Sequence, residues 1–164
     1  MNILGVDPGS LVTGYGIIRF ENNSFQCVDY GCIRLAKEAT MAKRLEKLHN
    51  SLHAILESTA IDSAGLESVF MAKNPDSALK LGQARGVILL TLSKAGLHID
   101  DYSPRLVKQT IVGKGSADKT QVNFMVKQLL SIQQTIPEDA ADALAIAICH
   151  AQHLTRKKLE KAYL

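Results

Sequence analysis

The sequence is poor in several residue types, and each scarcity excludes a class of protein. It has no tryptophan, few aromatic side chains and no low-complexity segment or internal repeat. No apolar run is long enough to span a membrane. The opening MNILGVDPGS lacks the basic head and small-residue cleavage site of a signal peptide. Three cysteines without a CxxC pair favour a reducing setting, so we expect a cytoplasmic protein.

What remains is the composition of a globular protein. The 164 residues are 46% apolar and 21% charged, enough for one domain with a full hydrophobic core. The formal net charge of +3 is compatible with a polyanionic partner but does not require one.

Hydrophobic patterns and turn residues predict an α/β fold. Helix caps are indicated at Asn74, Ser103 and Ser116, with Pro75 and Pro104 in first turns. The predicted strands are 2–7, 13–20, 25–35, 64–70 and 97–103, and the predicted helices are 40–58, 75–95, 104–112, 117–131 and a last one from 137. The first three strands form an antiparallel meander, so we expect a mixed sheet of about five strands with helices on both faces. Residues 1–154 form the predicted domain, and the basic segment 155–164 is expected to be a loosely held tail.

Two carboxylates stand at the ends of predicted strands. Asp7 closes the first strand in GVDPG, a position that a turn-forming aspartate also explains. Glu67 lies in AGLESVFM with apolar neighbours on both sides, and strand interiors are depleted in glutamate. An unpaired buried carboxylate is costly, so Glu67 needs water or a cation.

Two more carboxylates open the last helix, in PEDAADALAIAICH. Asp139 and Asp142 are spaced i, i+3 and so share a helical face, with Cβ atoms roughly 5–6 Å apart. A first-turn aspartate suits the helix dipole, but Asp142 lies deeper and precedes a run that is apolar on all sides.

The four acids together indicate a metal site. An all-oxygen set suits Mg²⁺, with Mn²⁺ as a substitute, and one or two such ions can drive phosphodiester hydrolysis. The histidine pairs, His49 with His53 and His150 with His153, lack HExxH context, and we interpret them as helix-surface residues.

Four blocks of sequence resemble the RuvC family of Holliday junction resolvases. They are GVDPGS with TGYG, LESVFMAKNPDSALKLGQARG, VKQTIVGKGSADK and DAADALAIAICH, in this order over about residues 2–153. The resemblance implies a ribonuclease H-like fold and a homodimeric, Mg²⁺-dependent endonuclease that nicks four-way DNA junctions at two symmetric strands. By motif it assigns metal binding and catalysis to Asp7, Glu67, Asp139 and Asp142.

The resemblance also implies a set of DNA contacts. Phe70 is expected to stack on a base near the junction centre, and Lys108 and Lys119 to hold the phosphate backbone beside the metal. Lys73 and Lys114 extend that surface, as do Lys80, Arg85 and Arg105. A branch-migration motor is an expected partner. A ribonuclease H-like nuclease acting on RNA and a non-catalytic junction-binding protein are the alternatives, and an actin-like ATPase would need a second domain.

Overall fold

The computed structural model describes residues 1–68 and 74–162. Its elements follow the predicted order. The strands are β1 (Asn2–Asp7), β2 (Val12–Glu21), β3 (Ser24–Arg34), β4 (Ser63–Glu67) and β5 (His98–Tyr102), and the helices are α1 (Met41–Ser58), α2 (Pro75–Lys94), α3 (Pro104–Val112), α4 (Lys119–Leu129) and α5 (Glu138–Ala162). Phe70 and Lys73 lie outside the described residues.

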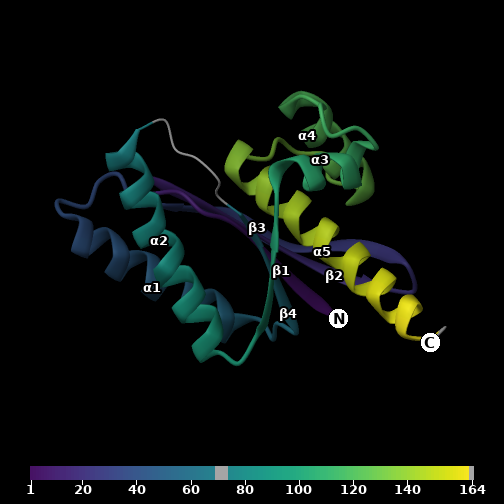
Figure 1. Ribbon diagram of the computed structural model, residues 1–164, viewed down its shortest axis with the longest axis horizontal. Coiled ribbons are helices and arrows are strands. Elements are labelled where there is room, and N and C mark those ends of the chain that lie inside the picture. The colour runs from purple at the N-terminus through teal and green to yellow at the C-terminus, as the bar shows by residue number, and fades with distance from the viewer. Residues whose placement is uncertain (69–73, 163–164) are drawn as a thin grey trace.

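The five strands form one mixed sheet in the order β3-β2-β1-β4-β5. The β1–β2 and β2–β3 pairs are antiparallel, whereas β1–β4 and β4–β5 are parallel. Helices α1 and α2 cover one face, and α3, α4 and α5 cover the other (Figure 1). The predicted fold class, an antiparallel meander joined to parallel strands with helices on both faces, is confirmed.

Two hydrophobic cores lie on opposite faces of the sheet. Strand β1 contributes Ile3 to the core beneath α5, and Leu4 and Val6 to the core beneath α1 and α2. Side chains alternate between faces along a strand, so Gly5 and Asp7 lie on the α5 face with Ile3.

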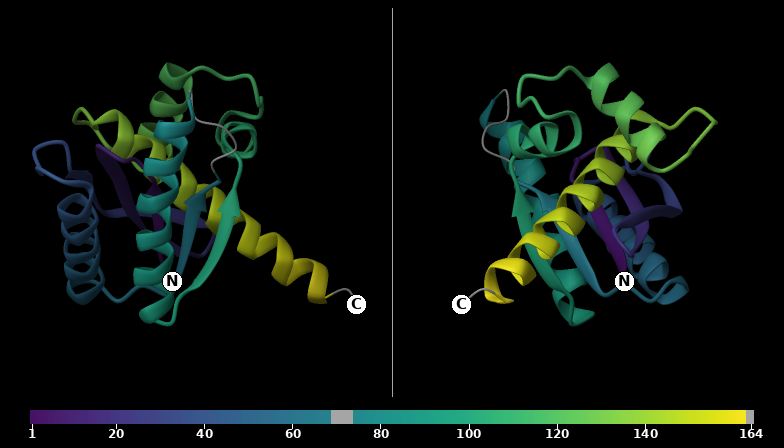
Figure 2. Two further views of the ribbon diagram at one scale, coloured as in Figure 1. Left: turned by 60° about the vertical axis from the view of Figure 1, so that its left-hand side comes forward. Right: turned by 90° about the vertical axis from the view of Figure 1, so that its right-hand side faces the viewer.

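Helix α5 crosses that face at close range (Figure 2). A Cβ atom at Gly5 would collide with the backbone of Ala143 and Ala147, and one at Gly16 would collide with Leu144. Glycine in the strands and alanine in the helix therefore allow α5 to pack against the sheet more closely than larger side chains would permit.

The helix starts test the capping predictions. Asn74 and Ser103 cap α2 and α3 as predicted, each accepting a hydrogen bond from a backbone N–H. The prediction of Ser116 as the cap of α4 is wrong. Asp118 caps this helix in a capping box with Gln121, because a carboxylate at 118 and a glutamine three residues later satisfy two free donors reciprocally.

Helix α5 is longer than the sequence pattern indicated. It extends through most of the basic segment beyond residue 154 and projects past the edge of the sheet (Figures 1 and 2). Lys157 in this part of the helix pairs with Asp100 of β5 at 2.9 Å.

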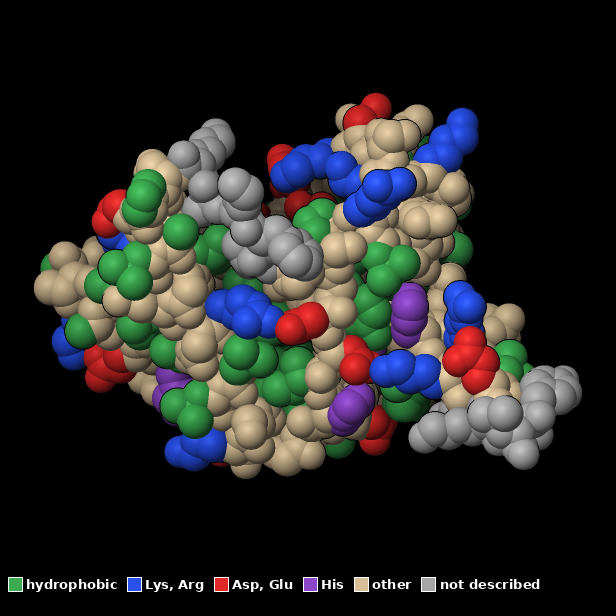
Figure 3. Space-filling view, in the orientation of Figure 1, with side chains coloured by type: hydrophobic (Ala, Val, Ile, Leu, Met, Phe, Trp, Pro, Cys, Tyr) green, Lys and Arg blue, Asp and Glu red, His purple; other side chains and the backbone are tan. Residues whose placement is uncertain are grey.

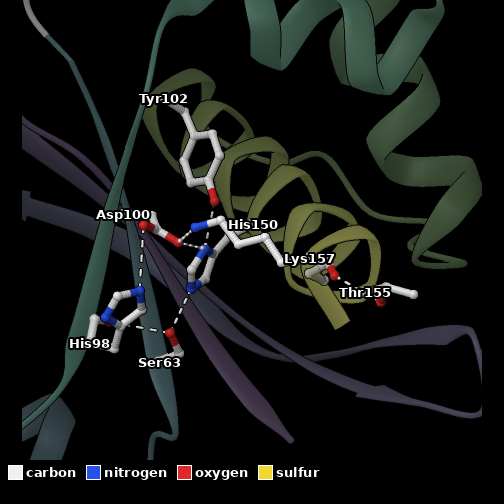
Figure 4. A network of polar contacts seen from close by, with 8 residues as sticks. Ser63, His98, Asp100, Tyr102, His150, Thr155 and Lys157 are labelled. Atoms are coloured by element: carbon white, nitrogen blue, oxygen red, sulfur yellow. Dashed lines mark hydrogen bonds and ion pairs between the residues drawn. The ribbon is translucent and has the colours of Figure 1, made fainter. Parts of the chain in front are cut away.

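The interpretation of His150 as a surface residue is wrong. Its side chain is 0% exposed, with Nε2 2.6 Å from the Ser63 hydroxyl and Nδ1 2.8 Å from the Tyr102 hydroxyl (Figure 4). Burial lowers the pKa of His150 to about 4, so the ring is neutral near pH 7. Gly65 leaves the space that the ring needs against β4.

Across residues 1–68 and 74–162, none of the helices combines the length and the apolar character that a membrane crossing requires.

Candidate functional site

Asp7 and Glu67 lie at the carboxyl ends of two neighbouring parallel strands. The β1–β4 register pairs Gly5 with Gly65 and Val6 with Leu66, so Asp7 and Glu67 come next in both strands. Leu66 and Val6 both belong to the core beneath α1 and α2. Because side chains alternate between the two faces along a strand, the next residues, Glu67 and Asp7, lie on the α5 face. Strand alternation thus brings both carboxylates to one edge of one face.

Helix α5 adds Asp142 to the same place. Asp7, Glu67 and Asp142 line a cavity of about 260 Å³, which we call the acidic cavity. Two lysines and several apolar residues complete its wall: Pro104, Val107, Lys108, Lys119, Val122 and Ala145.

The electrostatics of the acidic cavity reflect crowded negative charge. Burial and the neighbouring charge of Glu67, followed by Asp142 and Asp139, raise the pKa of Asp7 to about 8. Asp7 and Glu67 share a side-chain hydrogen bond, and burial and Asp142 raise the pKa of Glu67. Burial also raises the pKa of Asp142, although the Lys119 ammonium opposes this shift. The group favours a proton or a cation near neutral pH.

Asp139 occupies a different position from the other three acids. Its charge contributes to the raised pKa of Asp7 and of Asp142. Its side chain, however, lines a neighbouring hollow with the turn Pro8–Val12 and with Ser77 and Leu81 of α2. The structure thus places three predicted acids around one cavity and the fourth beside it.

The predicted basic residues occupy three kinds of position. Lys108 and Lys119 both reach the acidic cavity, and Lys119 Nζ forms an ion pair with Glu138 and lies 3.6 Å from Asp142. Lys114 is exposed in the α3–α4 loop, after the left-handed Gly113. Lys80 and Arg85 pair instead with Asp76 and Asp101. Lys and Arg side chains gather over α3 and α4, beside more recessed acidic ones (Figure 3).

The sequence did not indicate the apolar wall of the cavity. Val107 and Val122 desolvate the acids from α3 and α4, elements far from Asp7 in sequence. The spacing of the lining residues is the only sequence signal for this wall. Pro104, Val107 and Lys108 share one face of α3, and Lys119 and Val122 share one face of α4.

The donor set fits a hard divalent cation in type. Carboxylate oxygens surround the cavity, and the raised pKa of each acid shows that added positive charge would relieve repulsion. In the described ranges, no three His, Cys, Asp or Glu side chains are gathered tightly enough to hold an ion as they stand. The Lys119 ammonium lies beside Asp142, so an ion bound by this acid would compete with that positive charge.

A mixed sheet in this strand order, with carboxylates where β1, β4 and α5 meet, defines a ribonuclease H-like fold of the resolvase type. The RuvC family, described as crossover junction endodeoxyribonuclease RuvC, matches residues 3–150. Crossover junction endodeoxyribonucleases of Marinobacter nauticus and Dichelobacter nodosus are each 50% identical, over 98% and 93% of this chain and 90% and 86% of their own lengths. The chain belongs to the RuvC family, and its enzyme class is that of a crossover junction endodeoxyribonuclease.

Solved structures agree with this placement. Thermus thermophilus RuvC in complex with a Holliday junction substrate superposes with a TM-score of 0.90 at 27% identity, covering 96% of both chains. The yeast mitochondrial Holliday junction resolvase, at 15% identity over 99% of this chain and 86% of its own, shares the fold with a TM-score of 0.68. The family resemblance predicted from the four sequence blocks is confirmed.

Proposed function

We propose that this chain resolves four-way DNA junctions by Mg²⁺-dependent phosphodiester hydrolysis at the acidic cavity, as a homodimer that makes two symmetric nicks. The observation that carries the proposal is the meeting of three half-buried acids from β1, β4 and α5 with two lysines around one cavity. Family membership supports the reaction class, and the acids and lysines around the acidic cavity support assigning the reaction to this site.

Each acid has a role in this proposal. Asp7, Glu67 and Asp142 bind the metal directly, and Asp139 binds from the adjacent turn of α5 after a side-chain rotation. A bound Mg²⁺, or Mn²⁺ in its place, supplies Lewis acidity to the phosphate and a more acidic water. Two ions are compatible with four carboxylates, and one with three.

The lysines bind the substrate. Lys108 and Lys119 line the acidic cavity from α3 and α4, where their ammonium groups can hold the phosphates that flank the scissile bond. Hydrogen bonding to Glu138 raises the pKa of Lys119, which therefore stays charged throughout the neutral range.

Three further DNA contacts rest on the family resemblance. Phe70 is proposed to stack on a base near the junction centre, and Lys73 and Lys114 to contact phosphates. Lys114 lies in the exposed loop between α3 and α4, on the same layer of the molecule as Lys108 and Lys119.

Helix α2 is the proposed dimer interface. Leu79 and Leu90 are 63% and 60% exposed, and Gly82 and Gly86 lie between them on the same exposed stripe. Glycine inside a helix costs about 1 kcal/mol relative to alanine, so two exposed glycines there are best explained by close approach of another helix. A two-fold dimer presents two equivalent sites to a two-fold junction.

Two wider expectations complete the proposal. The family implies a branch-migration motor as partner. The proposed substrate is DNA, and an enzyme that cuts DNA must share its compartment, so we infer a cytoplasmic location.

A nicking assay tests the proposed function. Purified protein is incubated with a synthetic four-way junction, a linear duplex and an RNA–DNA hybrid of matched sequence, with Mg²⁺ or with a chelator. We expect paired nicks in the junction alone, and only with Mg²⁺. Cleavage of the hybrid in preference to the junction, or undiminished cutting in the chelator, would refute the proposal.

A further inference from the structure

A second hollow adjoins the acidic cavity along α4. Its volume is about 410 Å³, and we call it the α4 groove. It is lined by Lys119, Thr120, Asn123, Phe124, Lys127, Ile136 and Glu138. Lys119 lines both hollows, so the α4 groove begins where the acidic cavity ends.

Phe124 in this groove is not a core residue. Helix α4 buries its opposite face through Val122 and Val126, which are 4% and 0% exposed, whereas Phe124 is 60% exposed. Thr120 and Lys127 stand four and three residues from Phe124 and share its face of the helix, and Asn123 beside it lines the same groove. A large aromatic ring thus lies open to solvent among polar side chains.

The polar groups around Phe124 match a nucleotide. Lys127 lies at one end of the groove, and among the described residues its ammonium donates one hydrogen bond, to the Gln133 carbonyl at 3.3 Å, so it keeps donors for a phosphate. Thr120 and Asn123 offer neutral donors and acceptors between the two lysines. Glu138 is the one acid in the lining, and its carboxylate is paired with Lys119.

We propose that the α4 groove binds a DNA nucleotide adjacent to the cut, with its base stacked on Phe124 and its phosphate held by Lys127. A flat exposed ring between cationic groups is the arrangement by which single-stranded nucleic acid is bound without sequence preference. The inference rests on the proposed function, because it requires a strand in the acidic cavity to continue past Lys119. It predicts that this strand is unpaired or distorted where it leaves the cavity.

The absence of tryptophan from the chain allows a direct test. In Phe124→Trp the only indole lies in the α4 groove, and stacking on a base quenches its fluorescence. We expect marked quenching when this variant is titrated with a four-way junction in Ca²⁺, with an affinity close to that of the parent. In Leu159→Trp the indole lies on an exposed position of the distal part of α5, and we expect no quenching.

A second measurement separates stacking from charge. Phe124→Ala should weaken junction binding about fivefold or more, Phe124→Tyr should restore it, and Leu159→Ala should leave it unchanged. Lys127→Ala should reduce the slope of log affinity against log salt by about one. Unchanged emission of Phe124→Trp at saturating junction, or parental affinity of Phe124→Ala, would overturn the inference. If the parent protein itself neither binds nor cuts the junction, the proposed function has failed instead.

Discussion

At the scale of single residues, Asp7 carries the clearest conflict between folding and function. Its pKa is raised from 3.8 to about 8 by burial and by the neighbouring acids, so the folded protein holds a proton that the unfolded chain has released. Between these two pH values the unfolded state binds fewer protons, and the stability of the fold therefore falls as pH rises. Removing this charge should stabilise the metal-free protein.

Asp7→Asn tests this conflict, because asparagine keeps the size of the side chain and can still donate to Glu67. In a chelator at pH 8 we expect its melting temperature to exceed that of the parent by at least about 2 °C, the shift that roughly 1 kcal/mol produces at this chain length. The difference should narrow as pH falls toward 4, where the unfolded chain also begins to bind this proton. Glu57→Gln, on the exposed surface of α1, is the matched control. A lower melting temperature for Asp7→Asn at pH 8 would contradict the account.

Lys119 is a single side chain that lines both the acidic cavity and the α4 groove. Lys119→Ala removes a proposed phosphate contact and leaves Glu138 and Asp142 without their cation. We expect single-turnover cleavage to slow about tenfold, equivalent to roughly 1.4 kcal/mol, and Lys119→Arg to recover part of the rate. Lys43→Ala removes an exposed lysine that is paired with Glu46 on α1 and should have no effect. A parental rate for Lys119→Ala would show that this lysine is merely solvated.

At the scale of elements, the buried network of His150 joins α5 to β4 and β5. From Ser63 to Glu67 the strand rises about 13 Å, and from Asp142 to His150 the helix rises about 12 Å. The Ser63–His150 hydrogen bond (Figure 4) therefore stands at one end of two spans of similar length, with Glu67 and Asp142 at the other ends. Leu144 and Ile146 pack against strand glycines between these ends, and we expect the buried polar contact to define the register together with them.

Ser63→Ala and Tyr102→Phe each remove one hydroxyl from this network. Each leaves a buried histidine nitrogen unsatisfied, at a cost of about 1–3 kcal/mol in stability. We expect the maximal cleavage rate to fall severalfold while junction affinity stays unchanged, because Glu67 and Asp142 shift relative to each other. Ile88→Val, in the opposite core, loses about 0.5–1.5 kcal/mol and should keep the parental rate. An equal loss of cleavage rate in all three variants would show that the network contributes only to the stability of the fold.

The elements also show how far sequence can predict this structure. Strand ends, the caps Asn74 and Ser103 and the proline starts are local signals, and they were readable from a few residues. Ser116 and Asp118 are both residue types that cap helices, and Asp118 is the cap because it forms a capping box with Gln121. His150 was misplaced because its partners, Ser63 and Tyr102, are brought to it only by the folded sheet.

The site shows the same division. Glu67 and Asp142 were predictable because an acid in an apolar strand or within an apolar helix conflicts with its local pattern, whereas Asp7 also suits a turn and was indicated only together with the other acids. The hollow that Asp139 lines depends on the turn after β1 and on α2, and the groove around Phe124 depends on how α4 meets the start of α5. Such features are set by tertiary packing and leave no local signal.

At the scale of the whole molecule, the proposed dimer helix and the DNA-facing elements lie on opposite layers of the sheet (Figures 1 and 2). Leu90→Glu places a charge at one end of the exposed α2 stripe, and we expect it to dissociate the dimer at micromolar concentration. Sedimentation velocity measures the change, with Leu159→Glu as an exposed control. The monomer should retain a folded domain but lose paired nicking. A parental sedimentation coefficient for Leu90→Glu would exclude this face as the interface.

The most direct test of the central claim is junction cleavage by four charge-neutralising variants: Asp7→Asn, Glu67→Gln, Asp139→Asn and Asp142→Asn. Each is assayed in Mg²⁺ for nicking of a synthetic four-way junction, and in Ca²⁺ for binding of the same junction. The account predicts that every variant loses cleavage by at least about a hundredfold, roughly 2.7 kcal/mol, while binding stays close to that of the parent. Parental cleavage by any two of them would contradict it.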